Sequence, residues 1–229
     1  MPAPHLTRSE PTHGSRGIVL MLHGGAKTGL EPVGSRSGSL WRTNRMREVL
    51  EPRVLEAGLS LWMLRFSVRG WNLGAGPEPS PLPDARWAID QIGRTHPGLP
   101  IVLLGHSMGA RTAVQVADRP GVVGVVGLAP WLEPRDPVDA LAGKHLVAGH
   151  GSRDKITSAR MTRAYVERAR SVAASADFVD LGRLGHYMLA RPAAWNRFAL
   201  RSTLEVLARA DAGRSSAGHD DVSETTSAS

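Results

Sequence analysis

Residues 101–111 read IVLLGHSMGAR and combine an apolar run, a sharp turn and the start of a helix. The run 101–104 suits a strand that is covered on both faces, and residues 108–118 have a helical pattern. Between them stands Gly105-His106-Ser107-Met108-Gly109, a G-x-S-x-G pattern. Glycines in such a turn avoid collisions, and the serine hydroxyl is lifted clear of the sheet at a helix N-terminus. The pattern predicts a strained, nucleophilic serine, although a tight loop in which Ser107 only caps the helix also fits it.

Strand patterns and helix patterns alternate along the rest of the chain. Strands are expected over residues 17–23, 59–66, 101–106, 122–128, 145–148 and 177–181, and helices over 41–57, 84–95, 108–118, 158–171 and 192–210. This alternation predicts an α/β fold, doubly wound, with a mostly parallel sheet and helices on both faces. Ligands of such sheets bind beyond the carboxyl ends of the strands.

We expect a single domain over residues 17–210. Residues 1–16 show turn formers and charges without periodicity, which predicts a loose arm. Residues 211–229 are rich in Ser, Ala, Thr and Asp, and their low apolar content predicts disorder. The Gly/Ser/Arg-rich segment 27–39 is expected to be a mobile loop, and Pro52 is expected to kink or interrupt the helix that contains it.

The composition, with 41% hydrophobic and 21% charged residues among 229, is that of a globular protein. Cysteine is absent, which excludes disulfides, thiolate metal sites and a cysteine nucleophile. Residues 1–17 are polar, and the first apolar run, 18–22, is too short for a signal-peptide core. No run approaches the ~20 apolar residues of a membrane span. We therefore expect a cytoplasmic protein without a membrane span, whose oligomeric state is left open.

The formal net charge of +7 is carried mainly by arginines, which are scattered along the chain and not gathered with aromatic residues. A codon usage that favours arginine, alanine and glycine explains this charge better than nucleic-acid binding does, so no nucleic-acid partner is expected. The densest group comprises Arg36, Arg42, Arg45, Arg47 and Arg53. We interpret it as the solvated face of a helix, with attraction of an acidic substrate as the alternative.

Asp154 follows the strand at 145–148, and His186 follows the strand at 177–181. The chain order Ser107, Asp154, His186 is that of nucleophile, acid and base, each at a strand end on one edge of the sheet. His186 would accept the serine proton, and Asp154 would fix the imidazole tautomer. Glu133 and Asp136, which follow the strand at 122–128, are alternative acids.

His23-Gly24-Gly25-Ala26 directly follows the first predicted strand. Its glycines let the backbone approach a substrate, so the N–H of Gly25, or that of Ala26, can join the N–H of Met108 in holding an oxyanion. A simple tight turn would also use glycines here.

These motifs resemble those of the α/β-hydrolase superfamily, and the resemblance covers residues 17–210. His23-Gly24-Gly25 is similar to the family's oxyanion loop, residues 69–72 to its R-G-x-G turn, the pentapeptide at Ser107 to its nucleophile elbow, residues 151–154 to its G-x-x-D acid motif, and Gly185-His186 to its histidine motif. Two departures are Asn72 in place of a glycine and an N-terminal arm too short for two leading strands. The resemblance implies a small, capless serine esterase or thioesterase that forms an acyl-enzyme and needs no cofactor and no metal.

Residues 129–144, where many such proteins insert a cap, are too few for a cap domain. An open pocket is expected, walled by the 27–39 loop and by Trp71, Trp131 and Tyr187, each of which fits the core equally well. The substrate would be a small acyl ester or thioester. Two other functions stay open: an acyltransferase with the same triad, and a non-catalytic small-molecule-binding protein on the same scaffold.

Overall fold

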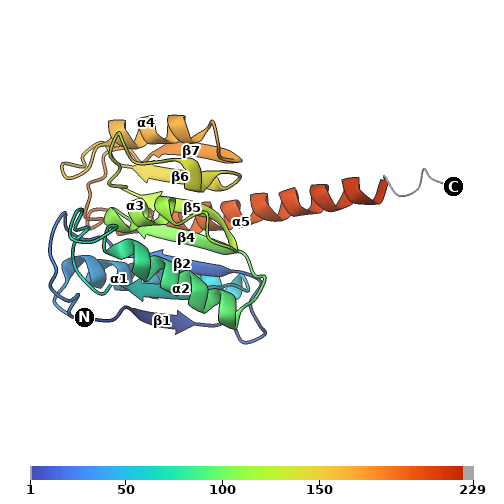
Figure 1. The fold of residues 1–229 in the computed structure, drawn as a ribbon, viewed down its shortest axis with the longest axis horizontal. Coiled ribbons are helices and arrows are strands. Elements are labelled where there is room, and N and C mark those ends of the chain that lie inside the picture. The colour runs from blue at the N-terminus through green and yellow to red at the C-terminus, as the bar shows by residue number, and fades with distance from the viewer. Residues whose placement is uncertain (1, 224–229) are drawn as a thin grey trace.

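The computed structural model describes residues 2–223, in which seven strands form one sheet with the order β1-β3-β2-β4-β5-β6-β7. The strands are β1 (His5–Ser9), β2 (Ile18–Leu22), β3 (Ser60–Arg65), β4 (Ile101–His106), β5 (Val122–Leu128), β6 (His145–His150) and β7 (Ser175–Asp180). Strand β1 pairs antiparallel with β3, and every other pairing is parallel. The carboxyl ends of the parallel strands therefore share one edge of the sheet (Figure 1).

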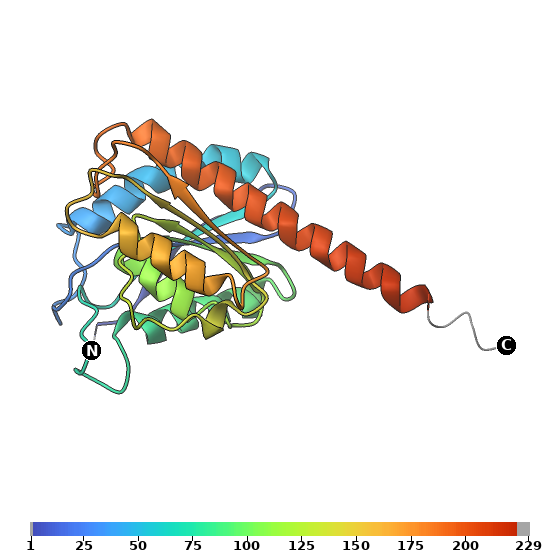
Figure 2. The same cartoon turned by 90° about the horizontal axis from the view of Figure 1, so that it is seen from above.

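Helices cover both faces of the sheet (Figures 1 and 2). One face carries α1 (Gly38–Glu56) and α5 (Pro192–Ser223), and the other carries α2 (Pro81–Thr95), α3 (Met108–Gln115) and α4 (Ala159–Ala169). Every residue of the central strands β2 and β4 is buried, as expected for strands covered on both sides. The predicted fold class is confirmed. The connection at 129–144 contains only the short 3₁₀ helix η1 (Asp139–Leu141) and builds no cap domain.

The loose arm expected over residues 1–16 is wrong, because residues 5–9 form the edge strand β1. Beside the backbone pairing with β3, the Trp62 indole donates to Glu10 Oε1 at 2.6 Å, and the Arg8 guanidinium lies 4.2 Å from the centre of the Trp62 ring. The strand escapes sequence analysis because main-chain hydrogen bonds hold it, with little burial, so it shows no apolar run.

Helix α5 continues to Ser223, so the disorder predicted for 211–229 is wrong over residues 211–223; residues 224–229 lie outside the described residues. Its end projects from the body of the molecule (Figures 1 and 2). The low apolar content of this stretch does not exclude a helix, and residues 211–223 contain no proline that would end one. Pro52 lies within α1 without interrupting it, since the turn beyond it keeps its hydrogen bonds, such as Ala57 N–H to Arg53 C=O at 3.1 Å.

The segment 27–39, expected to be mobile, is fastened to the loop after β3 over its first part. Short bridges pair Ala26 with Gly70 and Pro32 with Val68. Backbone hydrogen bonds join Gly70 N–H to Gly29 C=O at 2.9 Å and Val33 N–H to Ser67 C=O at 3.2 Å. The glycine-rich composition predicted a mobile backbone, but pairing with the loop after β3 restrains its first part.

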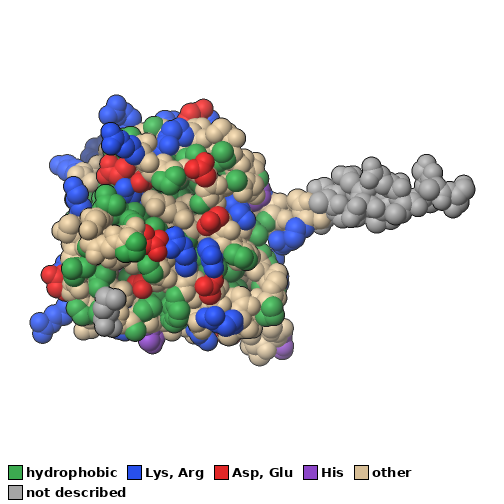
Figure 3. Space-filling model, viewed as in Figure 1, with side chains coloured by type: hydrophobic (Ala, Val, Ile, Leu, Met, Phe, Trp, Pro, Cys, Tyr) green, Lys and Arg blue, Asp and Glu red, His purple; other side chains and the backbone are tan. Residues whose placement is uncertain are grey.

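Basic and acidic side chains are interspersed on the face drawn in Figure 3, in keeping with their scatter along the sequence. Within residues 2–223, no helix combines the length and the apolar character that crossing a membrane would need.

Candidate active site

Strained backbone marks the carboxyl edge of the sheet. Within residues 2–223, all non-glycine residues with φ above zero lie in loops at this edge: Asn72 after β3, Ser107 after β4, Ala129 after β5, and Met188 and Arg191 after β7. Each such conformation costs on the order of 1–3 kcal/mol and persists only where the surroundings enforce it, which is typical of functional sites.

Ser107 stands at the sharp turn from β4 into α3, with φ 53° and ψ −114°. A Cβ at Gly105 would lie 2.5 Å from the Ala110 backbone nitrogen, and one at Gly109 would collide with the Leu22 carbonyl. Both flanking glycines are therefore required by close backbone approach, as the pentapeptide predicted. The Ser107 hydroxyl makes no hydrogen bond to any described residue.

His186 and Asp154 are hydrogen-bonded, with 2.8 Å between His186 Nδ1 and Asp154 Oδ2. Both side chains are buried, at 6% and 1% exposed. Because the carboxylate accepts, His186 carries its proton on Nδ1 and leaves the Nε2 lone pair available as a base.

The Asp154 carboxyl is held as an anion. Burial opposes its ionisation, but hydrogen bonds from His150 and His186 and from the backbone N–H groups of Thr157 and Ile156 outweigh that effect and hold its pKa below the usual range. The two backbone bonds end on Oδ1, at 2.9 and 2.8 Å, so the other oxygen is directed at the histidines.

His106 joins the histidine loop to the nucleophile elbow. Its Nε2–H donates to the His186 carbonyl at 3.0 Å, and the two ring centres lie 5.0 Å apart. Burial, together with the nearby His186, lowers the pKa of His106 to about 3, so the ring stays neutral. The loops after β4, β6 and β7 thus bring Ser107, Asp154 and His186 to one place, although Ser107 and His186 share no hydrogen bond.

The two alternative acids point elsewhere. Asp136 forms a buried ion pair with Arg111, at 2.6 Å, and Glu133 accepts from the Trp131 indole at 2.8 Å. Neither carboxylate contacts His186, whereas Asp154 does.

The existing hydrogen bonds also decide which backbone N–H groups are free to hold an oxyanion. The Ala26 N–H is already bonded to the Arg69 carbonyl at 3.0 Å. The N–H groups of Gly25 and Met108 reach no acceptor among the described residues. A Cβ at Gly25 would collide with the Met108 side chain, so these two residues are neighbours in space. Gly25 and Met108 remain the candidate pair.

Sequence reasoning missed a second histidine on the acid. His150, fully buried at the end of β6, has Nε2 3.2 Å from Asp154 Oδ2, and its Nδ1 lies 2.9 Å from Thr162 Oγ1. Thr157 Oγ1 also lies 2.9 Å from Asp154 Oδ2. The available signal was the position of His150, directly before the G-x-x-D motif of residues 151–154.

Of the three aromatic residues predicted as pocket walls, Trp71 and Trp131 line one cavity, and Tyr187 lies apart from it. Trp71 is buried and its ring centre lies 6.1 Å from that of Trp131, with the Arg111 guanidinium 4.5 Å from each. Trp71, Trp131 and Arg111 line a cavity of about 650 Å³ on the α3 side. Tyr187 is half exposed and lies with its ring centre 5.5 Å from that of His186.

A separate cavity of about 440 Å³ lies beside the candidate oxyanion turn. It is lined by residues 23–26, by Arg69 and by the segment 31–39. The segment 27–39 therefore does border the site, as a fastened wall.

Comparison with known proteins agrees with this architecture. A family model described as serine aminopeptidase, S33, matches residues 81–149, which include the elbow. Among solved structures, Est1E from Butyrivibrio proteoclasticus with ferulic acid bound superposes with a TM-score of 0.62 at 13% identity, over 90% of this chain and 96% of that one. The butyrate-bound esterase Est2 from Thermogutta terrifontis gives 0.65 at 15% identity, over 90% and 89%.

A serine hydrolase without a lid from Xanthomonas campestris gives 0.62 at 13% identity, over 87% and 88% of the two chains. No curated protein sequence matches the chain. The sheet order and these structural likenesses are those of the α/β-hydrolase fold. The chain has the α/β-hydrolase fold, in a form without a cap domain.

Proposed function

We propose that the chain is a serine hydrolase that cleaves a carboxylic ester or thioester, with Ser107 as nucleophile, His186 as base and Asp154 as acid. The observation that carries this proposal is the 2.8 Å bond from His186 Nδ1 to a buried carboxylate, in a loop tied to the strained elbow of Ser107. Est1E holding ferulic acid and Est2 holding butyrate, on the same fold, support a small acyl ligand.

The reaction follows from the positions of these groups. Ser107 Oγ attacks the carbonyl carbon while its proton passes to His186 Nε2, and the resulting oxyanion accepts from the N–H groups of Gly25 and Met108. The intermediate expels the alcohol or thiol, which takes the proton from His186. Water, deprotonated by the same nitrogen, then releases the acid and restores the serine.

The open site bears on substrate size. The connection 129–144 carries only η1, so no cap domain is built there over the nucleophile elbow. We therefore propose soluble esters of short or medium acyl chain as substrates, in preference to emulsified long-chain triglycerides.

A fluorophosphonate probe and a substrate panel test the proposal. The probe should label Ser107 alone, and p-nitrophenyl esters and acyl thioesters of graded chain length should be hydrolysed by the wild type and not by Ser107→Ala. A folded sample that neither reacts with the probe nor turns over any ester would favour the non-catalytic binding protein. Turnover only when an acceptor alcohol is added would favour acyl transfer.

A further inference from the structure

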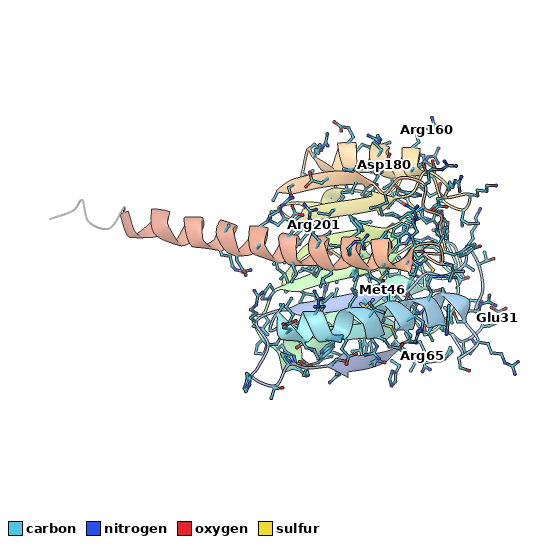
Figure 4. The ribbon with its side chains drawn as sticks, turned by 180° about the vertical axis from the view of Figure 1, so that it is seen from behind. Glu31, Met46, Arg65, Arg160, Asp180 and Arg201 are labelled. Atoms are coloured by element: carbon cyan, nitrogen blue, oxygen red, sulfur yellow. The ribbon has the colours of Figure 1, made fainter. Side chains whose placement is uncertain are left out.

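A groove of about 260 Å³ runs between α1 and the start of α5 and reaches the loop that follows His186. Figure 4 shows the two helices side by side on this face of the sheet, with Met46 labelled between them. Trp41, Arg42 and Met46 line the groove from α1, Met188 and Leu189 from the loop, and Asn196 from α5.

The rim of this groove is unusually apolar for exposed surface. Trp41 is 53% exposed, Val49 54% and Leu189 61%, and all three line the groove. Large apolar side chains that gather at one hollow mark a binding surface, whereas singly scattered ones do not.

Arg42 carries the uncompensated charge in this groove. Its Nε atom is buried without a hydrogen-bond partner, no carboxylate among the described residues pairs with it, and its guanidinium lies 5.0 Å from the centre of the Tyr187 ring. On the same helix, Arg45 and Arg47 are paired with Glu48 and Glu51. A half-buried cation without a counter-ion is unfavourable until an anion joins it, so Arg42 is poised for an anionic ligand.

The groove adjoins the proposed catalytic residues. Tyr187, under the Arg42 guanidinium, presents its ring at 5.5 Å from that of His186. Met188 and Arg191, which follow Tyr187 in this loop, have φ values of 56° and 54°. Leu189, between these two residues, lines the groove, and Tyr187 lies between the groove and His186.

We propose that this groove binds one arm of the ester substrate through an apolar chain and a carboxylate that pairs with Arg42. The inference rests on the proposed function and names its substrate class, amphiphilic esters with a free acid group. It also assigns Arg42, alone among the arginines of α1, a role beyond that of a solvated face, as a specificity residue.

Matched esters test it. In the first pair, mono-4-nitrophenyl suberate carries a free carboxylate at the end of its acyl chain, and its methyl ester masks that carboxylate. In the second pair, 4-(carboxymethyl)phenyl octanoate carries the free carboxylate in its leaving group, and its methyl ester masks it there. In one of these pairs the wild type should prefer the free acid by at least about tenfold in kcat/KM. Arg42→Gln should bring the ratio to about one, and Arg42→Lys, which keeps the charge, should retain part of the preference. Arg53→Gln, an exposed arginine at the far end of α1, is the matched control.

Binding separates failure of this inference from failure of the proposed chemistry. Monomethyl suberate should change the tryptophan fluorescence of Ser107→Ala, because Trp41 lines the groove, and dimethyl suberate should need at least about tenfold higher concentration. The difference should vanish when Arg42→Gln is added. Equal binding and equal turnover of the charged and neutral members would overturn the groove assignment while leaving the hydrolase intact. Charge-selective binding without any turnover would support the groove assignment and overturn the proposed hydrolase chemistry.

Discussion

Asp154 has two structural roles that a single substitution can separate. One oxygen closes the loop before α4 by accepting from the N–H groups of Ile156 and Thr157, and the other accepts from His186. Asp154→Asn can keep the loop bonds, yet its amide can donate to Nδ1 and so favours the wrong tautomer. We expect the fold to survive and kcat to fall by about 10⁴.

Steady-state kinetics beside circular dichroism check this expectation. Glu133→Gln is the control, because that side chain contacts Trp131 and can accept the same hydrogen bond as an amide. A mild effect of Asp154→Asn, with a collapse in Glu133→Gln or Asp136→Asn, would move the acid to the loop after β5.

His150 is a positioning residue in this scheme, since it acts on the acid and not on substrate. Its ring can accept from Thr162 through Nδ1 and donate from Nε2 to Asp154 Oδ2, at 3.2 Å. A hydrogen bond to a charged group is worth about 1.5–3 kcal/mol. If the Asp154 carboxylate turns away when this bond is lost, kcat falls by roughly 10–100-fold.

We expect His150→Phe to lower kcat by about that factor with KM nearly unchanged. His150→Gln, which restores a donor, should recover most of the loss. The comparison is made on samples matched in folded fraction by thermal unfolding. Equal kcat in the two variants would show that His150 only fills space.

At the level of elements, the wall of the site depends on Asn72, which holds the segment after β2 to the loop after β3. Its carbonyl accepts from Gly29 N–H at 2.7 Å, and its amide donates to the Gly29 carbonyl at 3.0 Å and to Ser80 Oγ at 3.1 Å. Its backbone is at φ 54°. Asparagine accepts this conformation at lower cost than most residues, which explains how it replaces glycine in the turn.

Asn72→Gly keeps that conformation and removes the side-chain bonds. It should cost about 1–3 kcal/mol of unfolding free energy, speed amide exchange over residues 26–33, and raise KM more than it lowers kcat. Asn72→Ala should cost about 1 kcal/mol more, because a Cβ is strained at positive φ. Urea titration and hydrogen exchange measure both effects. Unchanged exchange in Asn72→Gly would mean that the backbone bridges alone hold the wall.

The elements that the sequence predicted well are those whose burial is uniform. Strands β2 and β4 read as continuous apolar runs because helices cover both their faces. Strand β1 was missed because it lies at an edge, and the end of α5 was missed because its sequence has no apolar stripe.

The site divides in the same way. Ser107 could be singled out because close backbone approach requires Gly105 and Gly109 around it, and glycine is visible in a sequence. Asp154 and His186 were predicted as acid and base from their order in the chain and their places after β6 and β7. The contacts of His150, Asn72 and Arg42 could not be predicted, because a single polar residue shows no periodicity and its partners come from other loops. The roles of Trp71, Trp131 and Tyr187 depended on which cavity each faces, and that is fixed only by packing.

For the molecule as a whole, burial of histidines at the carboxyl edge ties stability to pH. His23 follows β2 and is buried; its Nδ1 lies 2.6 Å from the Gly24 carbonyl, and its Nε2 accepts from Phe66 N–H at 3.1 Å. Burial lowers the pKa of His23 to about 4, against the effect of the Gly24 bond. His106 behaves alike, with a pKa of about 3.

Both pKa values lie below the value of about 6.5 expected in the unfolded chain. Between pH 6.5 and about 4, His23 and His106 are therefore protonated in the unfolded chain but not in the folded protein, and stability is lost as pH falls. Each histidine contributes up to about 1.4 kcal/mol per pH unit. Asp84 acts in the opposite direction, because burial raises the pKa of its carboxyl. Asp154, whose pKa is lowered, adds a further loss only below about pH 4.

We therefore expect the unfolding free energy to be nearly constant from pH 8 to 7 and to fall by about 1–3 kcal/mol for each unit below 6.5, before any carboxylate of ordinary pKa titrates. Urea titrations at pH 7.5, 6.0 and 5.0 measure the slope. His23→Gln can still accept from Phe66 and should remove about half of it, whereas His13→Gln, at an exposed position, should leave it unchanged. A flat profile down to pH 4.5 would show that the unfolded chain shields its histidines as fully as the folded protein does.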